Sequence, residues 1–153
     1  MGKLPRHPPF GALVVTYRFR AGQPEFLLLH RAASEPDFEG EWAWGPPGGN
    51  REEGETIDQC ARRELLEETG FCLTPWRAGG GSFEWGLYVA EVPPDQEPAL
   101  SMEHDRFVWL AYDEAVVRVS PAVVRSQFVS AVAGIVRHGT AHLECRQSDG
   151  ERA

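Results

Sequence analysis

Three glutamates near the middle of the chain are spaced so that a helix would bring their carboxylates together. Glu64, Glu67 and Glu68 lie three and four residues apart, and at about 100° per residue they share one narrow arc of a helix surface. Like charges at this spacing destabilise a helix, whereas a bound cation offsets the repulsion. Carboxylate oxygens are hard ligands that bind Mg²⁺, Mn²⁺ or Ca²⁺. The spacing therefore predicts a divalent metal site.

The segment that carries these glutamates has its own helix signals. Thr56 with Gln59 three residues later fits a capping box, and Gly70 supplies a C-terminal stop. We therefore expect a helix over residues 57–69, with the carboxylates along the edge of its buried face. A metal in that position would be partly shielded from water.

A glycine- and proline-rich run, Trp44-Gly45-Pro46-Pro47-Gly48-Gly49, precedes the helix. Two adjacent glycines let the backbone approach a ligand closely, so that their amides and carbonyls can face a metal or a phosphate. We therefore expect Gly48 and Gly49 to contribute to substrate binding.

Residues 49–71 resemble the Nudix box, G-x5-E-x7-R-E-U-x-E-E-x-G-U, in which U is an aliphatic or other bulky apolar residue. The match holds at every position and spacing, at Gly49, Glu55, Arg63, Glu64, Leu65, Glu67, Glu68, Gly70 and Phe71. A chance match has a frequency on the order of one in 10⁹ per starting position. The resemblance implies a Nudix hydrolase with an α/β fold, in which a mixed, curved β-sheet is sandwiched between α-helices (an α/β/α sandwich).

The resemblance also implies a reaction, the Mg²⁺-dependent hydrolysis of a diphosphate linkage, with Mn²⁺ as a substitute. Glu64, Glu67 and Glu68 would bind the metal, with the Gly48 carbonyl as a backbone ligand, and a base must take the proton of the attacking water. Glu64 is one candidate base, because some family members use a box glutamate. Glu103 is the other, because its segment resembles one in dihydroneopterin triphosphate pyrophosphatases that reaches the metal site. A solvated loop carboxylate is the alternative interpretation of Glu103.

Two arginines have candidate roles. In the family that the box resembles, the arginine at position 63 pairs with the earlier glutamate, here Glu55, and orients a metal-binding carboxylate. Arg31 follows an expected strand, where its planar guanidinium could clamp a phosphate. An ion pair of Arg31 with Asp37, Glu39 or a box carboxylate is the alternative.

The remaining pattern predicts one domain, residues 1–137, followed by a polar tail, residues 138–153. A hairpin of two strands, 11–19 and 25–31, contains continuous apolar runs that are typical of strands covered on both faces. The other expected elements are strands at 72–75, 83–92 and 107–110 and helices at 112–119 and 121–137.

Some aromatic residues and histidines can be explained by structural roles alone. Trp42 and Trp44 alternate, which would place one in the core and the other beside a cleft, and core packing of both is the default interpretation. His30, His104 and His142 have no partner at metal-ligand spacing, and we expect none of them to be a ligand.

The box recognises a diphosphate linkage, and the group attached to it is chosen elsewhere. Residues 31–38, residues 59–61 and the Glu103 segment resemble the dihydroneopterin enzyme, which favours a nucleoside or pterin polyphosphate as the small-molecule substrate. Tyr88 falls near a base-stacking tyrosine of diadenosine polyphosphate hydrolases, although a core aromatic explains it equally. A dinucleoside polyphosphate hydrolase and a non-catalytic protein that binds nucleotide metabolites are the alternatives. A prenyl diphosphate isomerase would need a catalytic cysteine, and no cysteine lies in a suggestive motif.

Charge and composition limit the partners and the location. The chain of 153 residues has a net charge of −8, which argues against a broad nucleic-acid-binding face. A bound metal would still allow a polyphosphate to bind, since it inverts the local field. Three cysteines without a C-x-x-C spacing, together with the lack of a signal peptide or an 18-residue apolar run, favour a soluble cytoplasmic protein with no membrane contact.

Overall fold

The computed structural model describes residues 5, 7–33, 37–79, 82 and 84–135. Its labelled elements are β1 (Gly11–Arg20), β2 (Gln23–Arg31), β3 (Trp44–Gly45), β4 (Gly48–Asn50), α1 (Ile57–Thr69), β5 (Trp76–Arg77), β6 (Trp85–Glu91), β7 (His104–Leu110) and α2 (Tyr112–Arg118). A further helix, which we call the C-terminal helix, covers residues 122–135.

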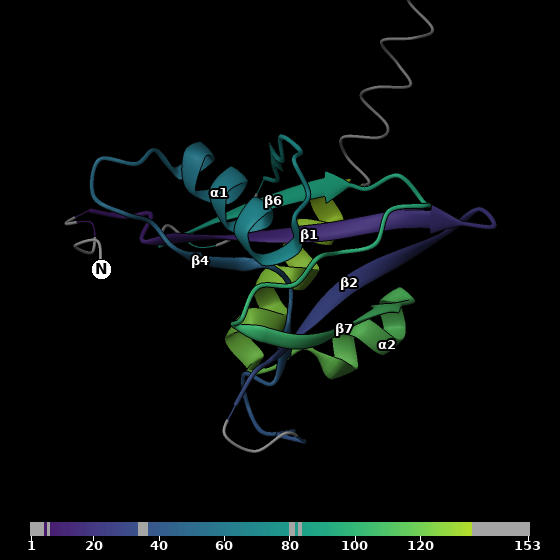
Figure 1. Ribbon diagram of the computed structural model, residues 1–153. Coiled ribbons are helices and arrows are strands. Elements are labelled where there is room, and N and C mark those ends of the chain that lie inside the picture. The colour runs from purple at the N-terminus through teal and green to yellow at the C-terminus, as the bar shows by residue number, and fades with distance from the viewer. Residues whose placement is uncertain (1–4, 6, 34–36, 80–81, 83, 136–153) are drawn as a thin grey trace, which may run out of the picture.

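Strand β1 lies at the centre of a mixed sheet. It pairs antiparallel with β2 through the expected hairpin and parallel with β6, while β4 pairs with its first residues. The order along the sheet is β3-β2-β1-β6-β5, and β7 pairs with β2. Figure 1 shows β2 diverging from β1 after the hairpin, so that α2 lies well away from α1.

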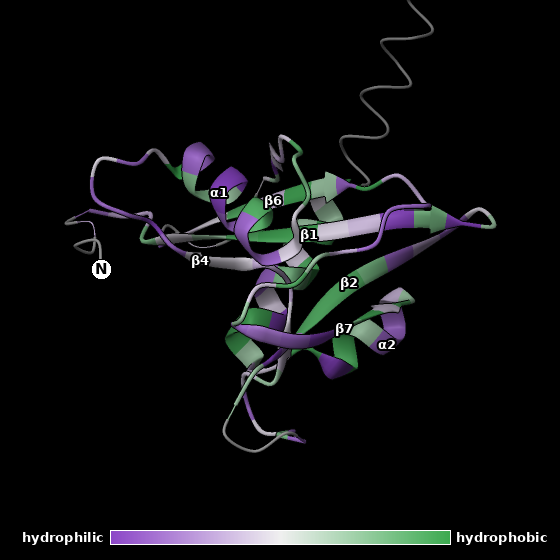
Figure 2. Ribbon diagram, viewed as in Figure 1, coloured by the Kyte–Doolittle hydropathy of each residue, from purple (hydrophilic) through white to green (hydrophobic). Residues whose placement is uncertain are grey.

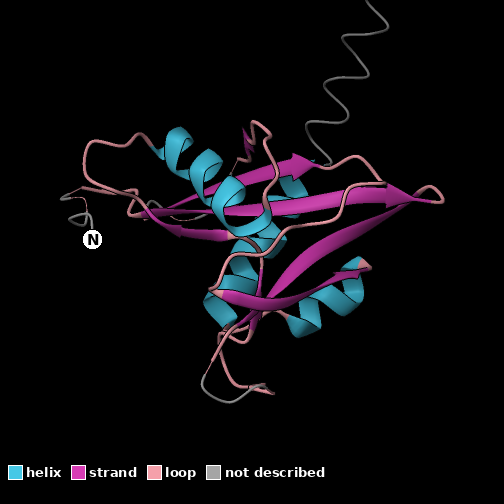
Figure 3. Ribbon diagram, in the orientation of Figure 1, coloured by secondary structure: helices cyan, strands magenta, loops and turns pink. Residues whose placement is uncertain are grey.

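Two apolar layers cover the sheet, one on each face. Ala12 and Val14 of β1 pack with Leu65 of α1, whereas the alternate residues Leu13 and Val15 pack on the other face, against α2 and the C-terminal helix. Figure 3 shows helices on both faces of the sheet, and in Figure 2 the buried half of β2 is hydrophobic. The α/β/α sandwich and the strands covered on both faces are thus confirmed.

The strand expected at residues 72–75 was wrong. These residues have no strand, and the pairing with β6 is made instead by Trp76 and Arg77, opposite Val89 and Tyr88. Pro75 lacks the N–H that a ladder requires.

Two short strands were not expected, and one began earlier than expected. β3 and β4 lie within the glycine- and proline-rich run, and β7 begins at His104 rather than at residue 107. The expected helix at 121–137 is helical over 122–135, and residues 136–137 and the expected tail at 138–153 lie outside the described residues. The single domain over residues 1–137 stays a prediction.

Within the described part of the chain, each helix is too short or too polar to cross a bilayer.

Candidate active site

The helix that carries the glutamates, α1, is fixed at both ends. The Thr56 hydroxyl accepts a hydrogen bond from the Gln59 amide at 3.1 Å, and the Gln59 side chain accepts one from the Thr56 amide at 2.9 Å, which completes the capping box. Gly70 ends the helix with φ 75° and donates its N–H to the Leu66 carbonyl at 2.8 Å. The rotational position of the glutamates therefore follows from the expected bounds of the helix, which are confirmed.

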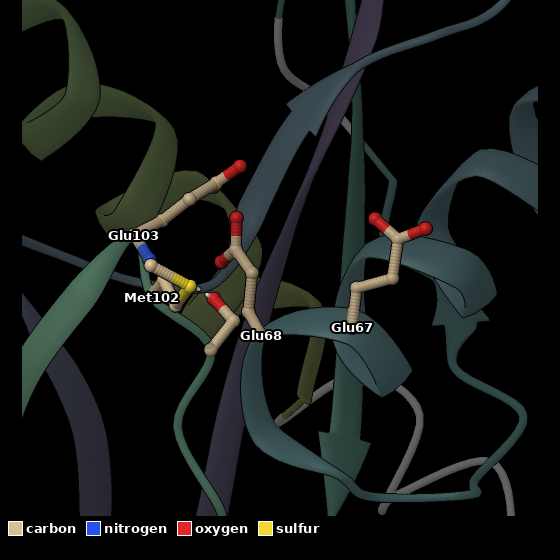
Figure 4. Close-up of a pocket in the computed structure, with 5 residues that line it drawn as sticks. Glu67, Glu68, Met102 and Glu103 are labelled. Atoms are coloured by element: carbon tan, nitrogen blue, oxygen red, sulfur yellow. Dashed lines mark hydrogen bonds between the residues drawn. The ribbon is translucent and has the colours of Figure 1, made fainter.

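The three box glutamates differ in burial. Glu64 and Glu68 are 8% and 4% exposed, whereas Glu67 lies on the exposed side. In Figure 4 the carboxylates of Glu68 and Glu103 lie close together and that of Glu67 stands apart. One ligand atom each from Glu68, Glu103 and His104 lie within 4.8 Å of one another. The site therefore joins α1 to the start of β7.

Backbone contacts hold Glu103 and Glu68 at this junction. The Glu103 carbonyl accepts a hydrogen bond from the Ala32 amide at 2.9 Å, just beyond the end of β2. The Gly48 amide of β4 donates to Glu68 Oε2 at 3.1 Å. One contact thus fixes the backbone of Glu103 beside the end of β2, and the other fixes the carboxylate of Glu68 against β4.

Each of the two adjacent glycines allows a different group to lie close to the backbone. A Cβ on Gly49 would lie 2.6 Å from the carboxylate of Glu64, which is the free end of a side chain. A Cβ on Gly48 would meet the backbone carbonyl of Ala12, which is fixed in the sheet.

This contrast gives a first prediction. We expect Gly49→Ala to fold but to displace the Glu64 carboxylate, so that kcat falls about 10²-fold, since small misplacements of reacting groups have effects of this size. Gly48→Ala should instead lower the free energy of unfolding by about 1–3 kcal/mol. Steady-state kinetics and urea unfolding of both variants measure the two effects. Equal losses of stability in the two variants would contradict the prediction.

Arg63 connects most of the acidic groups. Its guanidinium donates to both carboxylate oxygens of Glu55, at 2.6 and 2.9 Å, and to Glu64 at 2.8 Å. It also donates to Glu67 at 3.1 Å and to the Asn50 carbonyl at 3.0 Å. The expected pairing of Arg63 with Glu55 is therefore present, and the same side chain ties two box glutamates to the loop before α1.

Burial makes the carboxylates poor anions when no cation is present. Burial raises the pKa of Glu64, although the nearby charge of Arg63 opposes this. Burial also raises the pKa of Glu68 to about 9; the Gly48 N–H opposes the rise, and the charges of Glu64 and Glu103 add to it. Hydrogen bonds from Arg63 hold the pKa of Glu55 below its usual range. The buried end of the site thus favours a bound positive charge, either a proton or a metal.

The chemistry of the donor set fits a divalent cation. The converging groups are carboxylate oxygens and one imidazole, which are ordinary metal ligands. Burial lowers the pKa of His104, which keeps its imidazole neutral and able to donate a lone pair. Its buried Nδ1 has no hydrogen-bond partner among the residues that the structure describes. We did not expect His104 here, because Glu68, which completes the group with Glu103, comes from α1 rather than from its own segment.

A cleft of about 1330 Å³ contains this site. Its walls include the acidic residues Glu64, Glu67, Glu68 and Glu103, the glycines Gly48 and Gly49, Arg31 and Arg63, the aromatics Trp42 and Trp85, and Val123, Ser126, Gln127 and Ser130 of the C-terminal helix. The cleft therefore combines a metal-binding wall with cationic, aromatic and neutral polar groups.

Arg31 is exposed and lines this cleft opposite His104 in the β2–β7 register. In the described part of the chain it has no ion pair, and Asp37 and Glu39 lie instead 3.5 Å from Arg106. The alternative of an ion pair with either acid is therefore wrong, because the neighbouring strand residue takes both.

The aromatic expectations have clear outcomes. Trp44 is 6% exposed and packs in the core, whereas Trp42 is 51% exposed and lines the cleft. Tyr88 is 1% exposed in β6, and its hydroxyl donates to Asp58. Tyr88 is therefore a core residue and is not available to stack on a base.

Comparisons with known proteins agree with this geometry. A family model described as the NUDIX domain matches residues 7–130. The chain is 34% identical to the asymmetrical bis(5'-nucleosyl)-tetraphosphatase of Rattus norvegicus over 104 residues, which are 60% of this chain and 67% of that protein. A C. elegans Ap4A hydrolase in a binary complex is 27% identical with a TM-score of 0.64, over 82% of this chain and 96% of that chain. The E. coli dihydroneopterin triphosphate pyrophosphohydrolase shares the fold, with 23% identity and a TM-score of 0.59, over 80% and 93% of the two chains.

Proposed function

Because the chain belongs to the Nudix family and is a pyrophosphohydrolase, we propose that it cleaves a diphosphate linkage in a nucleoside polyphosphate with the aid of Mg²⁺. Dinucleoside polyphosphates are the first candidates, since the rat and C. elegans relatives named for such substrates are 34% and 27% identical. The similarity to the pterin enzyme supports the fold alone. The observation that carries the proposal is that Glu64, Glu67, Glu68 and Glu103 all line one cleft.

When bound, a divalent cation neutralises phosphate charge and lowers the pKa of a coordinated water. Glu64, Glu67 and Glu68 would hold this cation, and the Gly48 carbonyl is a further proposed ligand. Arg63 fixes two of these carboxylates through the hydrogen bonds described above.

Glu103 is our choice for the base that accepts the proton of the attacking water. Its side chain is exposed in the cleft and, among the described residues, receives no hydrogen bond. Glu64 is buried and already accepts from Arg63 at 2.8 Å, which makes it the less available base. A general base contributes about 10²–10⁴-fold to the rate.

Arg31 is proposed to bind a phosphate that lies beyond the metal. Its guanidinium lines the same cleft and lies opposite His104, one residue after Glu103. A planar guanidinium binds two phosphate oxygens at once, which fixes the orientation of the polyphosphate chain.

Trp42 is proposed to stack on a nucleobase, and this gives a second prediction. Stacking on an aromatic side chain contributes about 1–3 kcal/mol per base, so Trp42→Ala should raise KM about 5- to 150-fold with a smaller change in kcat. Trp42→Phe should retain most of the affinity. Kinetics with a dinucleoside tetraphosphate and with inorganic tripolyphosphate separate stacking from phosphate binding, because only the nucleotide should lose affinity. The same loss for both substrates would overturn the role of Trp42.

The whole proposal is tested by the release of phosphate and nucleotide products from a substrate panel. The panel contains dinucleoside polyphosphates, nucleoside triphosphates, ADP-ribose and a pterin triphosphate, each with Mg²⁺ and with a chelator. We expect chelator-sensitive turnover, highest with a dinucleoside polyphosphate. If the protein binds members of the panel but turns over none, the proposal fails and a non-catalytic binding protein takes its place.

A further inference from the structure

His104 is a half-buried histidine with an unmet hydrogen-bonding requirement. Among the described residues, its Nδ1 is shielded from solvent and has no hydrogen-bond partner. Buried polar atoms in folded proteins almost always have a partner. The first residue of β7 thus places a polar nitrogen that has no partner in the part of the chain that the structure describes.

The surroundings of His104 indicate which kind of group that is. One ligand atom each from Glu68, Glu103 and His104 lie within 4.8 Å of one another. Metal–ligand bonds of about 2.0–2.2 Å place the ligands of one ion about 3–4 Å apart. The separations in this group therefore lie near the spacing that the ligands of one ion require. Two carboxyl groups beside an imidazole favour a cation over a phosphate.

We propose that His104 and Glu68 are ligands of one metal position beside the proposed base Glu103, and that this position prefers Mn²⁺ over Mg²⁺. This inference rests on the metal dependence of the proposed function, and it adds a metal ligand from outside the Nudix box. Glu64 and Glu67 offer only oxygens, which suit Mg²⁺, whereas an imidazole favours the divalent transition metals. Glu68 is a proposed ligand both with Glu64 and Glu67 and with His104. It would therefore lie between the oxygen ligands of the box and the nitrogen ligand of β7.

The test is a spectroscopic measurement on the Mn²⁺-loaded protein without substrate. Electron spin-echo envelope modulation detects a ¹⁴N nucleus bonded directly to Mn²⁺. We expect this modulation in the wild type, its loss in His104→Gln and its retention in His7→Gln. His7 is a matched control, since it is exposed and its described contact, with Arg51, uses its backbone carbonyl.

Metal titrations measure the selectivity. By calorimetry, we expect His104→Gln to weaken Mn²⁺ binding about 10- to 100-fold, the size typical of altered metal environments, and Mg²⁺ binding by a smaller factor. Equal losses for the two ions would overturn the proposed preference.

The wild-type spectrum alone keeps the inference testable even if His104→Gln does not fold. Bound Mn²⁺ without ¹⁴N modulation would overturn the role of His104, as would modulation that persists in a folded His104→Gln variant. In either case Mg²⁺-dependent turnover of the substrate panel would still support the proposed function. If neither ion binds the wild type, the inference and the proposed function fail together.

Discussion

We expect the replacement of Glu68 by Gln to lower kcat/KM by about 10³-fold and to make the metal-free protein more stable at neutral pH. The loss of activity follows because the variant removes a carboxylate that lies among the proposed metal ligands, and electrostatic groups of this kind contribute factors of this size. The shape of the side chain and its ability to accept from the Gly48 amide are retained. Steady-state kinetics with the best substrate of the panel measure the loss.

The gain in stability follows from the pKa of Glu68. The pKa of Glu68 in the folded protein, about 9, lies above the ordinary glutamate value of 4.5. The contribution of Glu68 to the free energy of unfolding is therefore fully present below about pH 4.5 and is lost as the pH rises towards 9. The metal-free wild type should therefore lose thermal stability across this window more steeply than Glu68→Gln. Each kcal/mol corresponds to about 2–4 °C in Tm for a chain of this size.

Metal binding should show the opposite dependence on pH. The cation must displace the proton from Glu68, so the affinity of the wild type for Mg²⁺ should rise with pH up to about 9. Glu67→Gln is the matched control, because Glu67 is exposed and its loss should change the stability of the metal-free protein much less. Calorimetry and thermal unfolding at several pH values test both variants. A Glu68→Gln protein that is less stable than the wild type at pH 8 would contradict this account.

We expect the replacement of Arg63 by Lys to lower kcat about 10²-fold or more, with a smaller change in KM. Lysine keeps the positive charge but cannot reach Glu55, Glu64 and Glu67 together, because it lacks the planar fork of the guanidinium. Arg63 is thus a positioning residue, and its loss acts through the orientation of the carboxylates.

The pH dependence distinguishes this role from simple unfolding. The charge of Arg63 opposes the rise in the pKa of Glu64, so Arg63→Gln should raise that pKa further and weaken metal binding most at low pH. The activity deficit of Arg63→Gln should therefore narrow as the pH increases. Arg62→Gln is the matched control, since Arg62 is exposed on the same helix. A deficit that is constant between pH 6 and pH 9 would refute the positioning role.

The parts of the structure that could be predicted from sequence are those with local causes. Helix α1 has the expected bounds because the capping box and Gly70 act within the helix itself. The β1–β2 hairpin has a short turn and apolar strands, which are also local signals. By contrast, β3 and β4 are two and three residues long, and strands of this length show no period.

The parts that sequence analysis missed depend on distant contacts. His104 joins Glu68 because β7 pairs with β2 and β4 holds Glu68, and neither pairing is visible in the local pattern. Residue Arg106, two positions along β7, similarly takes the acidic partners considered for Arg31. The sequence motif identified the carboxylates, whereas the other residues around the site are brought there by strand pairing in the sheet.

The pairing of β1 with β6 bears on how the chain folds. These strands pair in parallel over seven residue pairs, from Gly11 opposite Trp85 to Tyr17 opposite Glu91, so most of the chain must be synthesised and ordered before they meet. Closing such a long loop costs entropy that local contacts cannot offset early, and high contact order slows folding. The β1–β2 hairpin and α1 can form first because their contacts are local. We therefore expect the metal-binding wall, which also needs β7, to assemble late in folding.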